Sequence, residues 1–336
     1  MKRGLALAMA VIGSLLAASS ARAQEQNLIF ATGLPPNMHF AQGVLRPWVE
    51  RINTAGAGLV HIDLRDGMAL ATPSNSYERV LDDAIQIGWG SQVYIAGKFR
   101  RTEVISLPGL FDNTEVGSVA FWRLYKSGLL DAEYDQIVPL MLVAFSQAEI
   151  HLAKPHKPLD SLAGLKLIGT SKQLSQAIAL LGGTPISLTT TEIYEAMQRH
   201  TVDGVATSWP VFPAFKLGEV SFFHIETGLG GAPGMVFMAK KKFDALSPAA
   251  RKIIAENSDE AQTRRFGAFM VQVAENIRNG FKSSPQHVIV APTPEQAKRI
   301  HDRLEPMISE WAHTAPDGKK VVDSFRASIA AVKAGH

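Results

Sequence analysis

The chain has 336 residues, of which 46% are hydrophobic and 19% charged, and it contains no cysteine. This length and composition can bury the cores of two domains, which argues against disorder, collagen-like repeats and coiled coil. Without cysteine there are no disulfides, cysteine-ligated zinc sites, iron–sulfur clusters or thiol nucleophiles. The net charge of +3 comes from the first 23 residues, which hold three of the 34 basic residues and none of the 31 acidic ones. Because no basic run exceeds Lys240–Lys242, nucleic acid is not an expected partner.

The N-terminus has the three-part pattern of a secretory signal peptide. A charged start is followed by an apolar run from Gly4 to Ala18 and then by Ala21 and Ala23, a small-residue cleavage site. The apolar run is shorter than the ~20 residues that a membrane span needs. We therefore predict that residues 1–23 are removed on export and that the mature protein is periplasmic.

Strand-like apolar runs and amphipathic helices alternate through the mature chain, a pattern typical of α/β folds with crossovers. In chain order the predicted strands cover residues 28–32, 60–64, 85–89, 138–145, 166–169, 205–208, 235–239 and 288–291. The predicted helices cover residues 39–53, 77–84, 171–181, 191–200, 248–280, 294–313 and 319–332. We expect two α/β lobes with a helical C-terminal tail. The first lobe would comprise residues 24–145 plus about 228–265, and the second residues 146–227 plus about 266–336.

Two segments resemble catalytic or metal-binding motifs, but each lacks a required residue or spacing. Trp89-Gly90-Ser91-Gln92 resembles the nucleophile elbow of hydrolases but lacks its second glycine. Glu149 and His151 share a face of a predicted strand, yet they lack the ligand spacing of a zinc site. We therefore predict no enzyme, no catalytic residue, no metal site and no cofactor, and keep an exported hydrolase as the less favoured alternative.

Glycines are concentrated between residues 228 and 234, at Gly228, Gly230, Gly231 and Gly234. They precede a predicted strand, whereas a dinucleotide-binding loop follows a strand and opens a helix. The segment is therefore interpreted as a crossover between the lobes, suited to a hinge.

Two long stretches resemble the periplasmic substrate-binding proteins of TRAP (tripartite ATP-independent periplasmic) transporters. One is Gly67–Pro108; the other is Leu162–Pro210, with Gly164-Leu165-Lys166, Gly182-Gly183-Thr184-Pro185 and Val202-Asp203-Gly204 in order. The resemblance implies the two-lobed periplasmic-binding-protein fold with a long helix linking the lobes, a ligand held between them, and no catalysis. It also implies delivery of the ligand, typically an organic or aromatic acid, to a membrane permease driven by an ion gradient. An exported binding protein serving another transporter or a sensor is the alternative.

The chain departs from that family where the ligand carboxylate is held. Most members carry an arginine just after the Gly-Leu-Lys block, and here Ile168 stands in its place. An aliphatic side chain cannot pair a carboxylate, and loss of such a clamp costs an acid ligand about 2–5 kcal/mol. Either the ligand depends less on a carboxylate, which we favour slightly, or another cation replaces the arginine. The candidate cations are Lys172, Arg79 and Arg65.

Position after strands, together with the family pattern, gives a set of candidate ligand-binding residues. Trp89 and Trp209 directly follow predicted strands and would form apolar walls. The remaining candidates are Asn75, Ser91, Gln147, Ile168, Lys172, Thr190 and Thr207. Because the candidates fall on both predicted lobes, ligand binding is expected to favour a closed state. We expect the protein to act as a monomer.

Overall fold

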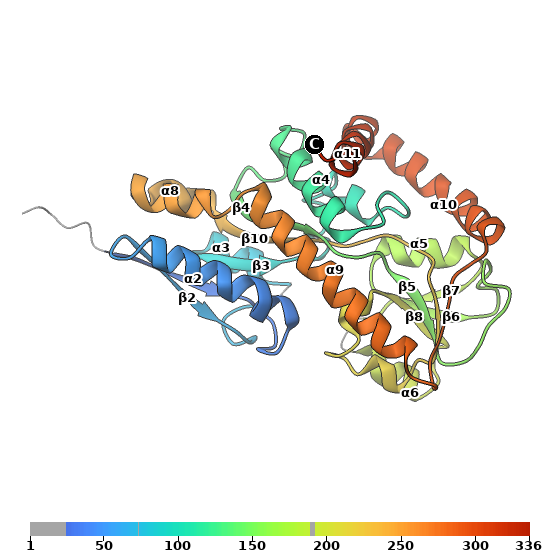
Figure 1. The fold of residues 1–336 in the computed structure, drawn as a ribbon. Helices are drawn as coiled ribbons and strands as arrows, with labels where there is room; N and C mark the ends of the chain where they lie inside the picture. Colours follow the sequence, from blue (N-terminus) through green and yellow to red (C-terminus); the bar gives the residue numbers. More distant parts are fainter. Residues whose placement is uncertain (1–24, 73, 189–191) are drawn as a thin grey trace, which may run out of the picture.

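The structure is a computed structural model, and it describes residues 25–72, 74–188 and 192–336. It has two β-sheets with helices on their faces, in an elongated two-lobed molecule (Figure 1). This confirms the predicted α/β class. Within the described ranges, no helix combines the length and the apolar character that a membrane crossing requires.

The sheet of the first lobe has the order β2-β1-β3-β10-β4. β1 pairs in parallel with β2 and β3, while β10 is antiparallel to β3 and β4. The strands are β1 (Gln26–Ala31), β2 (Val60–Arg65), β3 (Ile87–Gly90), β4 (Ile137–Ala144) and β10 (Pro233–Ala239). β4 therefore runs parallel to β3, and their carboxyl ends lie at the same edge of the sheet.

The sheet of the second lobe has the order β11-β9-β5-β8-β6-β7. β6 and β8 are parallel, and β5 is antiparallel to β8, so the start of β5 lies beside the end of β8. The strands are β5 (Glu149–Leu152), β6 (Lys166–Gly169), β7 (Thr184–Ile186), β8 (Gly204–Thr207), β9 (Phe223–Ile225) and β11 (Val288–Val290).

Helices pack on both sheets. They are α2 (Arg46–Ala55), α3 (Ser76–Leu81), α4 (Thr114–Lys126), α5 (Lys172–Leu180), α6 (Ile193–Gln198), α7 (Lys240–Ala245), α8 (Pro248–Glu256), α9 (Glu260–Lys282), α10 (Pro294–Thr314) and α11 (Gly318–Lys333). The predicted helix 39–53 is helical throughout, with a π-helical turn at Ala41–Leu45 just before α2. The predicted start of a helix at Thr191 lies outside the described residues.

The prediction of one continuous helix over residues 248–280 is wrong, because the structure has two helices there, α8 and α9, separated by a short interruption. The Asp259 side chain accepts a hydrogen bond from Gln262 N at 2.8 Å and so caps a new helix. The Asn257 carbonyl accepts the indole N–H of Trp48 at 2.8 Å. The Trp48 bond therefore lies at the C-terminal end of α8, and the Asp259 cap begins α9. Only the cap could be recognised from the sequence.

Helix α9 links the two lobes, as the resemblance implied (Figure 1). Near its start, Phe266 and Met270 are buried in the core that packs on β1 and β3. Near its end, Ile277 and Phe281 pack against the core of the second lobe. The apolar stripe of one helix therefore completes two cores.

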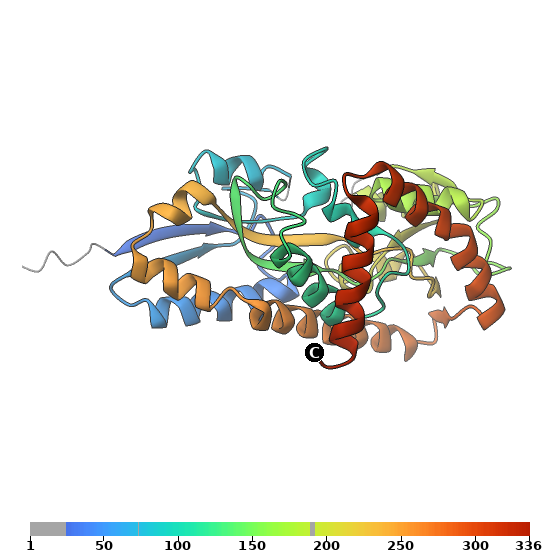
Figure 2. The ribbon, with the colours of Figure 1, turned by 90° about the horizontal axis from the view of Figure 1, so that it is seen from above.

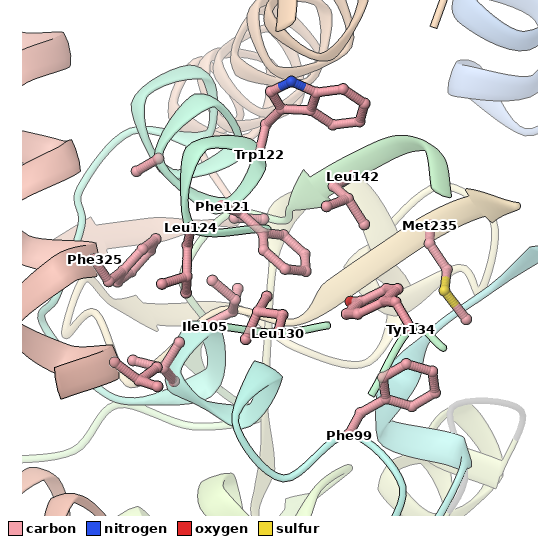
Figure 3. Close-up of a cluster of buried hydrophobic side chains, with 14 of the residues drawn as sticks. Phe99, Ile105, Phe121, Trp122, Leu124, Leu130, Tyr134, Leu142, Met235 and Phe325 are labelled. Atoms are coloured by element: carbon pink, nitrogen blue, oxygen red, sulfur yellow. The ribbon is translucent and has the colours of Figure 1, made fainter. Parts of the chain in front are cut away.

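The C-terminal helix α11 packs on the first lobe. Phe325 lies in the same buried cluster as Phe121 and Leu124 of α4 (Figure 3). Figure 2 shows α11 crossing the middle of the molecule, while α10 extends over the second lobe. This packing favours counting residues 318–333 with the first lobe, although the predicted boundaries place them in the second.

Two crossing segments, residues 145–148 and 226–232, connect the sheets and bond to each other. Phe145 N donates to Ala232 O, and Ala148 N donates to Gly230 O, each at 2.9 Å. Gly230 has a φ of +115°, and a Cβ there would lie 2.2 Å from Ser106 O, so no side chain fits. The glycine-rich segment joins β9 to β10 and is the crossover that the sequence predicts.

Candidate functional site

The short link between β4 and β5 positions the candidate site. Residues 145–148 are all that separates the end of β4 from the start of β5, and an extended chain of that length spans ~17 Å at most. The edge of the first sheet where β3 and β4 end therefore faces the edge of the second sheet where β6 and β8 end. Ser91 and Thr207 lie at these two edges, and Gln147 lies on the crossing segment between them.

Trp89 lies in an aromatic cluster made by Phe40, Trp89, Phe145 and Phe266, here called the first aromatic cluster. The Trp89 ring centroid is 4.8 Å from that of Phe40 and 5.8 Å from that of Phe145. Trp89 is 4% exposed, whereas Phe145 is only partly buried. Phe145 is thus the ring of this cluster with the most access to solvent. Sequence reasoning missed it because it counted the residue inside a strand.

Trp209 packs within the second lobe. Its ring lies 4.8 Å from the ring of His151 and stacks on Phe281 at 5.7 Å. It is 6% exposed, so both tryptophans belong mainly to the core of their own lobes. Their contact with a ligand stays a prediction.

Gln147 is the candidate with an unused donor. Its Oε1 accepts from Gly230 N at 2.7 Å, while its Nε2 is buried without a hydrogen-bond partner among the described residues. The residue is 9% exposed. A buried amide without a partner is costly, and a ligand or a water molecule that accepts from it removes this cost. Ser91 is less available, because its Oγ donates to Pro233 O at 2.6 Å.

The other candidates have different environments. Ile168 is fully buried against Ile193 and Val205, so it makes an apolar core contact at the position where the family resemblance led us to expect an arginine. Thr207 is buried, and its carbonyl accepts from His151 Nε2 at 3.1 Å. Ligand contact stays a prediction for both.

The remaining polar candidates within the described residues are not buried in the cores of the lobes. Asn75 Oδ1 accepts from Thr72 N at 2.7 Å and so closes a local turn. Lys172 is exposed at the first turn of α5, whose N-cap is Ser171. Arg65 forms an ion pair with Asp63 at 2.6 Å, and Arg79 is exposed. Thr190 lies outside the described residues.

Three histidines form a hydrogen-bonded chain beneath α9. Because the Thr207 carbonyl can only accept, His151 donates from Nε2 and accepts at Nδ1 from His224 Nδ1 at 2.9 Å. His224 Nε2 then accepts from His287 Nδ1 at 3.1 Å. Burial lowers the pKa of His224 to about 3, and burial also lowers the pKa values of His151 and His287. The chain is therefore neutral at pH 7.

A carboxyl group lies at the junction of the crossing segments. Glu149 Oε2 accepts from Gly228 N at 3.0 Å and from Thr227 N. Burial raises the pKa of Glu149 to about 8, against the opposing effect of these two donors. Beside it, Arg278 of α9 donates twice to the carboxylate of Glu226, once from Nη2 at 2.9 Å.

These groups are suited to binding rather than to bond cleavage. Ser91 Oγ donates to a backbone carbonyl, so the elbow-like sequence does not bring a nucleophile to a base. Residues 25–72, 74–188 and 192–336 contain no group of three or more His, Asp or Glu residues arranged to hold a metal ion.

Two surface hollows stand out, and neither is lined by a candidate ligand residue. One, of about 90 Å³, lies beside the crossing segment 226–228 and α10. The other is open and lies between α2 and Asn257. The site proposed from the strand ends is therefore defined by its polar and aromatic groups and not by an enclosed cavity.

Comparison with known proteins gives the family. Residues 30–314 match the model of the bacterial extracellular solute-binding proteins, family 7. The outer membrane transporter protein TsaT of Comamonas testosteroni is 26% identical over 336 residues, covering 96% of each chain.

Solved structures share the fold. A TRAP solute-binding protein from Rhodoferax ferrireducens, in complex with copurified benzoate, is 26% identical with a TM-score of 0.83, covering 92% of this chain and 99% of that one. A marine metagenome TRAP solute-binding protein specific for aromatic acid ligands, in complex with 3-hydroxybenzoate, has a TM-score of 0.84 at 21% identity, with the same coverage. The chain therefore belongs to family 7 of the bacterial extracellular solute-binding proteins, which capture small molecules for TRAP permeases.

Proposed function

We propose that this protein binds an aromatic monocarboxylate between its lobes and delivers it to a TRAP permease. The observation that carries the proposal is the pair of Phe145 and Gln147 on one crossing segment. Phe145 offers a partly exposed ring that extends the first aromatic cluster, and Gln147 offers a buried donor, Nε2, that has no hydrogen-bond partner among the described residues. An aromatic ring that bears a carboxylate fits such a pair. The benzoate held by the Rhodoferax ferrireducens protein supports this ligand class.

The replacement of the family arginine by Ile168 sets how the ligand is held. A hydrogen bond from a neutral amide to a carboxylate contributes about 1.5–3 kcal/mol, less than the 2–5 kcal/mol that the loss of a buried charge pair costs. More of the affinity must then come from burying the aromatic ring, at about 25 cal/mol per Å² of apolar surface. The site should therefore discriminate more strongly by ring than by charge. Lys172, exposed on α5, is the alternative cation.

Closure of the lobes completes the proposal. Trp89, Ser91 and Asn75 belong to the first lobe, while Thr207 and Trp209 belong to the second. A ligand that touches both shifts the population towards a closed state by as much as its affinities for the two states differ. The lobe boundaries are proposed near residues 145 and 228, with α9 shared and α11 counted with the first lobe.

The cellular setting belongs to the same proposal. The exported form would begin at Gln24, after removal of residues 1–23, and would act in the periplasm as a monomer without nucleic acid. The extracytoplasmic location of the family supports this placement.

Isothermal titration with benzoate, 3-hydroxybenzoate, neutral benzamide and the non-aromatic succinate tests the ligand class. Benzoate and benzamide are expected to bind within about tenfold of each other, because the anchor is a neutral amide, and succinate is not expected to bind. Phe145→Ala should weaken benzoate binding. Binding of succinate in preference to both aromatic ligands would refute the proposal.

A substitution that introduces a negative charge, with a matched control, isolates the role of Gln147. Gln147→Glu keeps the acceptor for Gly230 N and replaces the free N–H donor by an acidic group, so benzoate should lose affinity more than benzamide. Gln286→Glu, at an exposed position, is the matched control. Equal loss for both ligands would show that Gln147 does not face the carboxylate. Lys172→Ala should leave benzoate affinity unchanged, and a large loss would identify Lys172 as the replacement cation.

A further inference from the structure

The hollow of about 90 Å³ described above lies where the two lobes and a crossing segment meet. Its walls come from three parts of the chain: the turn Pro108–Gly109, the crossing residues 226–228, and α10. Pro108–Gly109 is flanked by Leu107 and Leu110 of the first-lobe core. Ile300 and Leu304 of α10 belong to the core of the second lobe. We call this hollow the hinge pocket.

The lining of the hinge pocket is apolar inside and acidic at its rim. Ile300, Leu304 and Ile308 form the apolar wall, and Glu226 and Glu305 bring carboxylates. Glu226 is already paired with Arg278. Glu305 is half-exposed, and His301 Nε2 is 3.8 Å from its Oε2, too far for a hydrogen bond. The pocket thus combines an apolar wall with a carboxylate free to accept from a cation.

The volume limits the size of an occupant. The hollow has a volume of about 90 Å³, which suits a small occupant. A chain of three or four carbons ending in an ammonium group has an apolar body for the wall and three N–H donors for Glu305. Aromatic acids carry the wrong charge for this carboxylate.

The hinge pocket is connected to the candidate ligand site through hydrogen bonds. Thr227 and Gly228, which line the pocket, donate their backbone N–H groups to Glu149. Glu149 is in turn the β-sheet partner of Thr207 at the cleft edge. An occupant that fixes residues 226–228 therefore acts on the segment about which the lobes would move.

We propose that the hinge pocket is a second binding site, which takes a short alkylammonium ion and changes the affinity of the cleft for its ligand. The change in cleft affinity rests on the proposed function; the binding of the ammonium ion does not. An occupant wedged between the Pro108–Gly109 turn and α10 favours the arrangement of the lobes in which the pocket has this volume. By linkage, the cleft ligand must change the affinity for the ammonium ion by the same factor.

The test uses n-propylammonium as probe, with n-propanol as its neutral isostere, in ligand-observed NMR of the mature protein. Binding on the order of a millimolar dissociation constant is expected for the cation, as for any ligand of so few atoms. Binding should be lost in Glu305→Gln, which removes the free carboxylate, and in Ala297→Phe, which fills the pocket from an exposed position of its rim. Asp302→Asn, exposed on the same helix outside the lining, should leave it intact.

The coupling is measured by titrating benzoate with and without saturating n-propylammonium. A change of about fivefold in benzoate affinity is expected in the wild type and none in Glu305→Gln. Equal binding of n-propanol, retention of binding in both pocket variants, or an unchanged benzoate affinity would each overturn the inference. If benzoate itself fails to bind, the proposed function fails, while loss of n-propylammonium binding in Glu305→Gln still supports the second site.

Discussion

The buried histidine chain predicts a specific loss of stability in mild acid. His224 has a folded-state pKa of about 3, because burial opposes its charged form, against 6.5 when exposed to solvent. The unfolded chain therefore binds more protons below pH 6.5, and stability falls as the pH drops from 6.5 towards 3. From these two pKa values, His224 alone costs about 2 kcal/mol between pH 7 and pH 5. That is a large share of the 5–15 kcal/mol that typically holds a protein folded.

Urea unfolding of the wild type and of His224→Gln, followed by tryptophan fluorescence at both pH values, isolates this contribution. The variant loses packing and hydrogen bonds with His151 and His287, so it should be less stable at pH 7. It cannot take up a proton in the unfolded state, so the gap should narrow by about 2 kcal/mol at pH 5. His39→Gln, at an exposed position, is the matched control. A gap for His224→Gln that is the same at both pH values would refute the neutral buried chain.

Three further predictions concern the crossing segments and one helix start. Gly230→Ala should lower the free energy of unfolding by about 3 kcal/mol or more, because its Cβ would lie 2.2 Å from Ser106 O. Gly97→Ala is the control, since a Cβ there would meet no atom within 4 Å, and it should cost about 1–2 kcal/mol. Chemical unfolding measures both. Glu149→Gln should gain stability relative to the wild type as the pH rises from 5 to 9. The raised pKa of Glu149 means that the wild type loses stability over this range, because its buried site disfavours the ionised carboxyl. Unfolding curves at pH 5 and pH 9 measure this, and the same difference in unfolding free energy at both pH values would contradict it. Asn113→Ala should cost about 1 kcal/mol of thermal stability, because Asn113 Oδ1 accepts from Glu115 N and Val116 N and caps α4; an unchanged unfolding free energy would show that water replaces the cap.

The sequence alone determined the class of fold and the family. Alternation of strands and helices is local information. Two glycines of the family blocks also have specific backbone requirements: Gly164 has a φ of +82°, and a Cβ on Gly204 would lie 2.3 Å from His151 O. The glycine-rich crossover was predictable for the same reason, since Gly230 adopts a backbone conformation that other residues avoid.

Only the tertiary structure decided which groups at the strand ends are available. Trp209 follows β8 as predicted, whereas Trp89 lies within β3. Each packs into the core of its lobe against a ring far away in sequence, Phe266 for Trp89 and Phe281 for Trp209. The orientation of the Gln147 amide, with Oε1 paired and Nε2 left without a partner among the described residues, depends on Gly230, which lies 83 residues away. The packing of the Phe145 ring depends on Trp89, which lies 56 residues away. Burial and hydrogen-bond partners are properties of distant pairs, and a sequence pattern records only neighbours.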